Sequence, residues 1–240
     1  ESHFNQVQDR GEALVMDRHP ATKTVEAYTN AMQTQWSWLL QLSMCLETHM
    51  RHAASYHQFY ERGRECEHWL NSQTEKMNTY FNREHVTLDD GERYLREIQS
   101  VRDDMAHYQN QIDQLVSDSR DVVPLKVRGQ RQTRPRRVTA LCAYKQLSMS
   151  IAKGEECIML DNFQKTKWNI RNSNGMEGLV PAVCFLIPPP DEEAIGYANL
   201  IKRQLEELKR LWTDRQRQLK KHMIFATIKI VKSWDINQFR

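Results

Sequence analysis

An apolar stripe that continues from Val25 to Phe81 constrains the fold more than any other feature of the sequence. Apolar residues recur at alternating three- and four-residue steps, as on one face of an α-helix, without a proline or capping signal between them. A helix of roughly 55 residues would be about 80 Å long. A single globular domain has no need of such a length. Consecutive helical repeats do, because the last helix of one repeat can continue as the first helix of the next.

A shorter stripe precedes the long one and predicts a separate helix. It covers residues 4–15 and ends before Pro20, because proline cannot continue a helix. Thr22 or Thr24 is then expected to cap the long helix with its side-chain oxygen. Each helix is apolar on one stripe only, so it must pack against its neighbours in a left-handed bundle.

Two more helices are expected beyond the long one. A break at residues 82–90 separates it from a helix that Thr87 can cap, with a stripe that ends near Leu115. The last helix begins after Pro190, and its stripe continues to the end of the chain. The helices are therefore expected to be the last two of one three-helix repeat, followed by three helices of a second.

The apolar period changes from about 3.6 to about 2 between residues 121 and 188. Strands are expected at residues 139–144, 156–160, 168–171 and 178–180. Asn172-Ser173-Asn174-Gly175 supplies a hairpin turn. A stretch of about 50 residues with about five short strands fits a small barrel, which is marginally stable alone and would gain from burying one face on the adjacent bundle.

Composition excludes several classes of protein. The chain has 240 residues, enough for two or three compact units, and its net charge of +3 argues against a general nucleic-acid-binding protein. No run of about 18 apolar residues occurs, so no transmembrane segment is expected. The N-terminal residues lack the regions of a signal peptide, and the sequence reads as a segment of a longer protein. Five scattered cysteines favour a reduced cytosolic setting over a disulfide framework.

The strand-rich stretch resembles an SH3 domain, and the whole chain resembles the plakin domain of the plakin and spectraplakin family. The SH3 landmarks are Ala140-Leu141-Cys142-Ala143-Tyr144, Lys153-Gly154-Glu155, Trp168 and Val180-Pro181-Ala182-Val183-Cys184-Phe185. The wider resemblance adds Gln33-Thr34-Gln35-Trp36-Ser37-Trp38-Leu39-Leu40, Val123-Pro124-Leu125-Lys126-Val127-Arg128 and Leu186-Ile187-Pro188-Pro189-Pro190. It implies a mainly α fold: tandem three-helix spectrin repeats with a small all-β SH3 barrel inserted in one of them.

The resemblance also implies where the domains begin and end. Residues 1–50 would be helices B and C of a first spectrin repeat, and residues 46–121 and 191–240 would form the second, with its helix A continuous with the preceding helix C. The inserted SH3 domain with its linkers would occupy residues 122–190, with a core at 138–188, between helices B and C of the second repeat.

In function, the resemblance implies a structural cytoskeletal linker and not an enzyme. Family members lie in the cytoplasm at cell junctions, such as hemidesmosomes, and join intermediate filaments, actin or microtubules to adhesion receptors. This segment would be a rod that transmits load, without a cofactor or a metal. The departure of residues 61–88 from vertebrate members is consistent with an invertebrate spectraplakin.

The peptide-binding groove of the SH3 stretch has lost most of its usual residues. A working groove needs stacked aromatic rings and acidic side chains that pair with an Arg or Lys of a proline-rich ligand. Cys142 and Cys184 replace two of the rings, Ala143 replaces an acid, and only Tyr144 of the first motif is retained. The loop 145–153 contains no Asp or Glu. Conventional PxxP binding is therefore not expected.

The position of Trp168 depends on the strand register. If Ile170 points into the core, Lys167 occupies the place of the groove tryptophan and Trp168 points to the other face. A shift of one residue would return Trp168 to the groove. Both registers remain open from sequence.

The resemblance implies that the neighbouring spectrin repeat covers this groove. The residues of the contact would be Cys142, Tyr144, Lys167, Trp168, Pro181 and Cys184. Such a contact would stiffen the rod, and force could open it and expose a cryptic site. The alternative is an adaptor that binds a junctional or cytoskeletal partner through an unconventional SH3 or repeat surface.

Other residues admit both a functional and a plain structural interpretation. Cys45, His49 and His52 could share a helical face as metal ligands, and Cys66 beside His68 could suggest a nucleophile. No second ligand pair and no oxyanion or phosphate loop accompanies them, so neither a metal site nor catalysis is expected. The stripes place Trp36, Trp69 and Trp212 in the bundle cores, whereas Trp38 lies off the stripe.

A basic run follows the second helix of the second repeat. Its members are Lys126, Arg128, Arg131, Arg134, Arg136 and Arg137, with no acid among them. Such a run can bind an acidic partner, either lipid headgroups or a filament surface. The other interpretation is a solvated linker, or one that pairs with acids of its own bundle.

Overall fold

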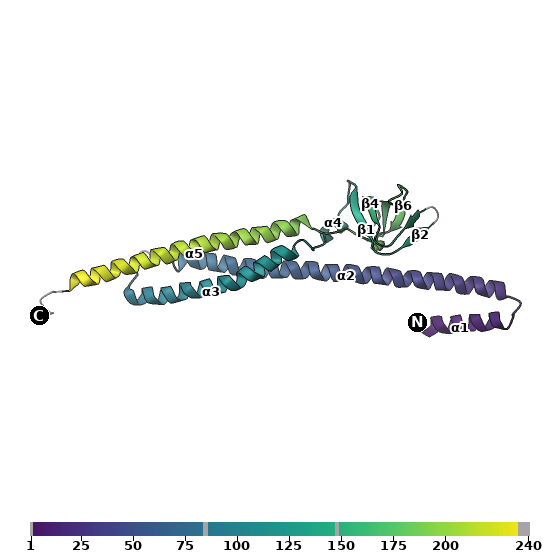
Figure 1. Ribbon diagram of the computed structural model, residues 1–240, viewed down its shortest axis with the longest axis horizontal. Coiled ribbons are helices and arrows are strands. Elements are labelled where there is room, and N and C mark those ends of the chain that lie inside the picture. The colour runs from purple at the N-terminus through teal and green to yellow at the C-terminus, as the bar shows by residue number, and fades with distance from the viewer. Residues whose placement is uncertain (1, 84–85, 147–148, 235–240) are drawn as a thin grey trace. The chain divides into compact units, whose positions relative to one another are not determined.

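The computed structural model describes residues 2–83, 86–146 and 149–234 (Figure 1). The chain divides into two compact units, one of residues 1–52 with 126–188 and one of residues 53–125 with 189–240. The expected extension of the last helix to residue 240 and parts of the predicted break and loop at 82–90 and 145–153 lie outside the described residues.

The first unit begins with two helices. Helix α1 (Ser2–Met16) precedes α2 (Thr22–Thr79), whose residues up to 52 belong to this unit. A Cβ on Gly11 of α1 would lie 2.5 Å from Thr29 Cγ2, so glycine permits the two helices to approach closely. The predicted threonine cap is wrong, because the Thr22 hydroxyl donates to the His19 carbonyl at 2.6 Å. The His19 ring instead accepts the Ala21 N–H at 3.2 Å.

The prediction of one long helix is confirmed. Helix α2 has 58 residues, but its described N-terminal part does not bury the predicted stripe: Leu39, Leu46 and Met50 are more than half exposed. A neighbouring face that includes Cys45 is buried instead, against the barrel of the same unit. The prediction chose the wrong face because the barrel that covers α2 lies far away in the sequence, and a local apolar period does not show which segment will cover a helix.

The second unit is a three-helix bundle. Residues 53–79 of α2 pack with α3 (Leu88–Asp118) and α5 (Glu192–Ser233) (Figure 1). Thr87 caps α3 as predicted, since its side chain accepts the Asp90 N–H, and Asp191 caps α5 in the same way through Glu193 N–H. The core is apolar, with Leu70, Met77, Ile98, Ile112, Leu115, Ile201, Leu205 and Leu208 almost fully buried.

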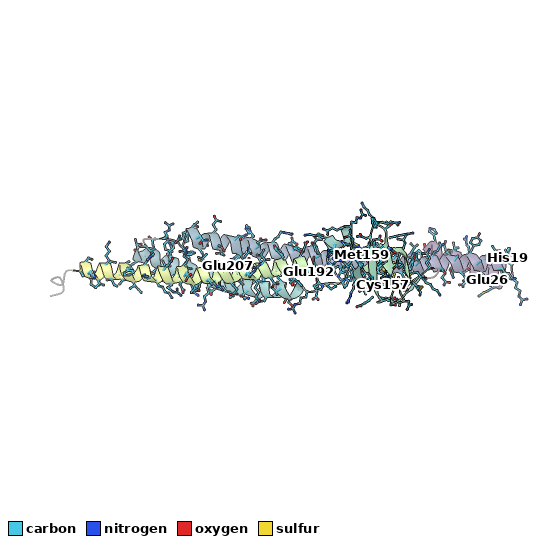
Figure 2. All side chains as sticks on the ribbon, turned by 90° about the horizontal axis from the view of Figure 1, so that it is seen from above. His19, Glu26, Cys157, Met159, Glu192 and Glu207 are labelled. Atoms are coloured by element: carbon cyan, nitrogen blue, oxygen red, sulfur yellow. The ribbon has the colours of Figure 1, made fainter. Side chains whose placement is uncertain are left out.

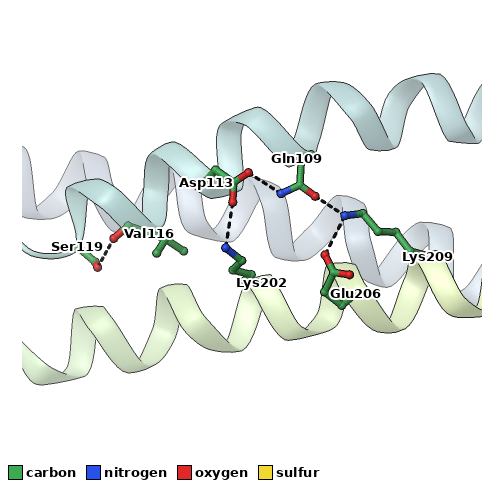
Figure 3. A network of polar contacts seen from close by, with 7 residues as sticks. All are labelled: Gln109, Asp113, Val116, Ser119, Lys202, Glu206 and Lys209. Atoms are coloured by element: carbon green, nitrogen blue, oxygen red, sulfur yellow. Dashed lines mark hydrogen bonds and ion pairs between the residues drawn. The ribbon is translucent and has the colours of Figure 1, made fainter.

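A polar network joins α3 to α5 on the bundle surface (Figure 3). Asp113 accepts from Lys202 Nζ at 3.2 Å and from Gln109 Nε2 at 2.6 Å. Lys209 donates to Gln109 and to Glu206. These side chains are partly exposed, so the network sets the alignment of the two helices more than it stabilises them.

The inserted segment forms a short helix and a small β-structure. Helix α4 (Leu125–Gly129) leads into a five-stranded antiparallel sheet with the order β6-β5-β4-β1-β7 and a separate β2-β3 hairpin. The bounds are β1 Arg136–Ala140, β2 Tyr144–Gln146, β3 Met149–Ile151, β4 Glu156–Asp161, β5 Lys167–Arg171, β6 Glu177–Pro181 and β7 Phe185–Leu186, with a 3₁₀ turn at Ala182–Cys184. Cys157 and Met159, both on β4 (Figure 2), are buried, while Ile158 between them is partly exposed.

Several local predictions for this segment hold and others fail. The turn after β5 is confirmed: Gly175 has φ +80°, a left-handed conformation that suits glycine. The predicted strand 139–144 is wrong, because β1 runs from 136 to 140. The sequence carries no signal for helix α4 or the hairpin β2–β3, since elements of three to five residues are too short to show a period.

Candidate functional site

The groove cysteines lie inside the barrel core. Cys142 and Cys184 are buried together, whereas Tyr144 is only half-buried and Ala143 is exposed. The side chain of Cys142 hydrogen-bonds with Cys184, which together with burial raises the pKa of the Cys142 thiol. A protonated, buried thiol is a poor nucleophile. These positions therefore act as small apolar groups and not as reactive ones.

The barrel selects one of the two registers left open for Trp168. Trp168 and Ile170 are both buried, at 2% and 0% exposure, so the two side chains share the core face of β5. Lys167 points to the groove and pairs with Pro181 in the β5–β6 register. The groove therefore carries a lysine where an ordinary SH3 domain has its tryptophan.

Helix α2 lies beside the groove within the same unit. The ring of Trp38 is 5.8 Å from the ring of Tyr144, centroid to centroid, and the side chain of Cys45 hydrogen-bonds with Cys142. His49 Nε2 lies 2.9 Å from the carbonyl oxygen of Val183. A carbonyl can only accept, so Nε2 carries the proton and donates.

These α2 residues form one helical face. Trp38, Leu42, Cys45 and His49 are spaced by four, three and four residues, and Leu42 packs on the cluster that contains the groove cysteines. Burial raises the pKa of Cys45 to about 12, and its hydrogen bond to Cys142 acts in the same direction. Burial and the nearby Arg128 lower the pKa of His49. The spacing was visible in the sequence, but nothing there showed that the face meets a barrel about 100 residues away.

Arg128 belongs to the interior of this unit and not to an open basic surface. Its guanidinium lies 4.6 Å from the centroid of the Trp168 ring and donates to the carbonyls of Phe185 and Ala182, at 2.8 and 2.7 Å. Burial lowers the pKa of Arg128. Such bonds fix the loop after β6 onto α4.

The other members of the basic run are placed differently. Arg131 lies over the Phe163 ring, with its Cζ 4.0 Å from the centroid. Arg134, Arg136 and Arg137 are exposed, and the last two belong to β1. Lys126, in α4, is exposed as well. The exposed part of the basic run is therefore Lys126 in α4, the linker with Arg131 and Arg134, and the first two residues of β1.

The three tryptophans expected in the cores are half-buried. Trp36 stacks on Phe4 of α1 at 4.8 Å. Trp69 stacks on Tyr108 of α3 at 4.0 Å, nearly parallel. Trp212 donates its indole N–H to the carbonyl of Ile98 at 2.6 Å. Each ring joins two helices, but only Trp69 and Trp212 pack against the bundle core, and they lie at its border.

The residues considered as metal ligands or as a nucleophile have structural places in the fold. Across residues 2–83, 86–146 and 149–234, no group of three or more His, Cys, Asp or Glu side chains could hold a metal ion. Cys66 is buried in the bundle beside Gln111, and burial raises the pKa of its thiol. All five cysteines are free. Within the same residues, no helix is long and apolar enough to cross a membrane.

Two family models match separate parts of the chain, one in each compact unit. A family model for an SH3 domain matches residues 124–188, and one for a spectrin-like repeat matches residues 57–123. The crystal structure of a rigid four-spectrin-repeat fragment of the human desmoplakin plakin domain matches 99% of this chain with a TM-score of 0.82 and 30% identity. The chain belongs to the plakin family. It covers 55% of that fragment.

Curated plakins show the same relationship along almost the whole chain. Human microtubule-actin cross-linking factor 1 is 32% identical over 235 residues, which are 97% of this chain, and the mouse protein is 33% identical over the same length. Desmoplakin-A of Danio rerio is 32% identical over 238 residues. The chain spans 3% of the length of the cross-linking factors and 11% of desmoplakin-A. The predicted family and the predicted fold, spectrin repeats with an SH3 domain, are confirmed.

Proposed function

We propose that this plakin segment is a non-enzymatic structural part of a cytoskeletal linker, in which the SH3 domain packs on helix α2 instead of binding a PxxP peptide. The observation that carries the proposal is the α2 face of Trp38, Cys45 and His49, which meets Tyr144, Cys142 and Val183 of the barrel. The name of microtubule-actin cross-linking factor 1 supports the linker role, and the rigidity stated for the desmoplakin fragment supports the structural one.

The chemistry of the groove supports the absence of PxxP binding. Prolines bind to SH3 domains between stacked rings, and here Cys142 and Cys184 are too small to make such walls. The retained Tyr144 already contacts Trp38. Lys167 would repel the Arg or Lys that usually accompanies the prolines.

A force-sensitive contact is the finer part of the proposal. The bundle core and the barrel core are separate clusters, and the contact between α2 and the barrel rests on a few side chains of one helical face. Load applied along the chain would therefore release the SH3 domain from α2 before it unfolds either core. The released groove would then offer a cryptic site.

The proposed organisation keeps the boundaries expected from sequence. Residues 1–50 would be the end of one spectrin repeat, residues 46–121 with 191–240 the next, and residues 122–190 the insertion. The proposed location is the cytoplasmic side of a cell junction, where a linker of this kind would bear tension. Intermediate filaments, actin or microtubules would be bound by other parts of the protein.

Cysteine labelling under force tests the proposal. The chain would be held by its termini while a maleimide reports which thiols become accessible. At intermediate force we expect Cys45, Cys142 and Cys184 to react, because release of α2 uncovers the barrel face where these three thiols meet. Cys66 in the bundle core and Cys157 on strand β4 should stay protected until those cores unfold. If all five thiols react only at one common force, the contact is not a gate. Micromolar binding of a PxxP peptide to the unloaded chain would exclude the covered groove.

A further inference from the structure

A cavity of about 650 Å³ remains between α2 and the barrel, within the first unit. One wall is polar and comes from α2, with Thr34, Ser37 and Gln41. The Trp38 and Tyr144 rings lie where the two walls meet. The packing of the SH3 domain on α2 thus leaves part of the SH3 peptide groove open, and α2 forms one of its walls.

The sign of the charge at this cavity is reversed relative to a proline-binding SH3 groove. Lys145 of β2 and Lys167 of β5 line it, both exposed, and no Asp or Glu of the described residues does. Lys153 contributes to the same region, because it acts electrostatically on the thiols of Cys45 and Cys142. These thiols lie one helical turn beyond Gln41 and one residue before Ala143 of the cavity wall.

The surrounding domain has the same excess of positive charge. Residues 126–188 contain eleven Lys and Arg against four Asp and Glu, although the whole chain has a net charge of only +3. A positive field over the domain attracts acidic partners and raises their rate of association. The cavity lysines would then select where such a partner binds.

We propose that this cavity binds an extended acidic peptide. One apolar or proline side chain of the peptide lies against the Trp38–Tyr144 ring pair, and flanking Asp or Glu carboxylates pair with Lys145 and Lys167. The hydroxyl and amide groups of Thr34, Ser37 and Gln41 hydrogen-bond to the peptide backbone, which must find partners when it is bound. The proposal rests on the packing of the SH3 domain on α2, since α2 supplies one wall.

The walls favour a peptide over a membrane. A bilayer surface is flat, and its headgroups contact protruding basic residues more readily than lysines that line a cavity with two walls. The exposed Arg134, Arg136 and Arg137 are better placed for a flat anionic surface. The two groups of basic residues can therefore be separated by mutation.

The test uses the whole 240-residue chain. A fluorescein-labelled peptide of alternating Glu and Pro, about 12 residues and so up to about 40 Å long, is titrated by anisotropy beside a Lys-Pro peptide of equal length. The variant K145E/K167E is compared with R134E/R136E, which changes the net charge equally. We expect binding of the acidic peptide only, with a loss of at least about tenfold for K145E/K167E and less than about threefold for R134E/R136E. Equal losses in the two variants, or equal binding of the two peptides, would overturn the proposal.

Two further measurements separate the causes of failure. Protection of Cys45, Cys142 and Cys184 from maleimide shows whether K145E/K167E keeps the SH3 domain on α2. Lost binding with retained protection supports the cavity as the site. Absent binding in the native chain, with these thiols protected, overturns the peptide proposal and leaves the packing intact. Binding to vesicles of phosphatidylserine and phosphatidylcholine should be weakened by R134E/R136E and not by K145E/K167E. If K145E/K167E abolishes vesicle binding, the cavity is a lipid site and the peptide proposal is wrong.

Discussion

The indole ring of Trp38 in α2 lies 5.8 Å, centroid to centroid, from the phenol ring of Tyr144 in β2. Tyr144 is the aromatic residue retained from the first SH3 groove motif, and its ring partner comes from a helix 106 positions earlier in the chain. The groove of this SH3 domain is thus completed by its own chain. This relationship connects the fold to the proposed function and can be tested without applied force.

Replacement of Trp38 by Ala should loosen the barrel from α2. The ring pair is lost together with the apolar area that it covers, and such pairs contribute about 0.5–1.5 kcal/mol beyond burial. We expect Cys45 and Cys142 to react with maleimide about tenfold faster than in the native chain, since about 1.4 kcal/mol corresponds to a factor of ten. Trp36→Ala is the matched control, because Trp36 stacks on Phe4 of α1 instead. Equal acceleration in both variants would contradict the specific role of Trp38.

Two glycine replacements in the second unit should have opposite signs. A Cβ at Gly63 of α2 would lie 2.5 Å from Tyr197 Cε1, and the Tyr197 hydroxyl donates to Glu67 at 2.9 Å. The ring must move and the hydrogen bond is strained, so Gly63→Ala should lower the free energy of unfolding by about 1–3 kcal/mol. Gly196 of α5 has no atom within 4 Å of the corresponding position. Gly196→Ala should therefore raise the free energy of unfolding by up to about 1 kcal/mol, because alanine has a higher helix propensity than glycine.

Urea unfolding followed by circular dichroism measures both variants. The pair shares the same chemical change and the same bundle, so intrinsic helix propensity cancels in the comparison. Stabilisation by Gly63→Ala would mean that Tyr197 can rotate away without loss, and would contradict the close packing of α2 on α5.

Replacement of Arg128 by Lys should destabilise the barrel. A lysine cannot donate to the carbonyls of Phe185 and Ala182 together while it lies flat on the Trp168 ring. We expect a loss of about 1–3 kcal/mol in the free energy of unfolding, because a buried acceptor is left without its donor. The exposed Arg134, six positions later, is the control, and Arg134→Lys should stay within about 0.5 kcal/mol. Similar effects of the two changes in urea unfolding would show that Arg128 has no special place in the fold.

The burial of His49 beside Arg128 predicts a pH dependence. Burial, then Arg128, holds the pKa of His49 below its ordinary value of 6.5; the hydrogen bond to the Val183 carbonyl opposes this shift, and His52 adds to it. The neutral form is therefore favoured in the folded chain. The stability that depends on neutral, buried His49 is fully present above pH 6.5 and is lost as the pH falls below that value, where the unfolded chain binds the proton more readily.

Thermal unfolding of the native chain and of His49→Gln between about pH 7.5 and about pH 5.5 checks this prediction. Glutamine can still donate to the Val183 carbonyl but does not titrate, so the variant should lose less stability on acidification. His68→Gln, at an exposed position of the same helix, should follow the native chain. A constant difference between the native chain and His49→Gln over this range would exclude His49 as the source.

Local signals in the sequence determined the main helices and the place of the insertion. The long stripe gave the single helix α2, Thr87 gave the start of α3, and Gly175 gave the turn after β5. Each of these depends on interactions within a few residues, which a local pattern records. The motifs around Tyr144 and Pro181 indicated the family, because they occur in the order that is characteristic of an SH3 domain.

Only the tertiary structure decided which residues form the candidate site. It buried Trp168 and left Lys167 at the groove, turned Cys45 and His49 toward the barrel, and placed Arg128 under the loop after β6. These positions follow from packing between segments that lie 50 to 140 residues apart, as the separations of 57 residues for Arg128–Phe185 and 134 for His49–Val183 illustrate. The sequence shows which side chains are available for such contacts. Which of them become buried depends on the whole fold, because a face is buried only where another segment covers it.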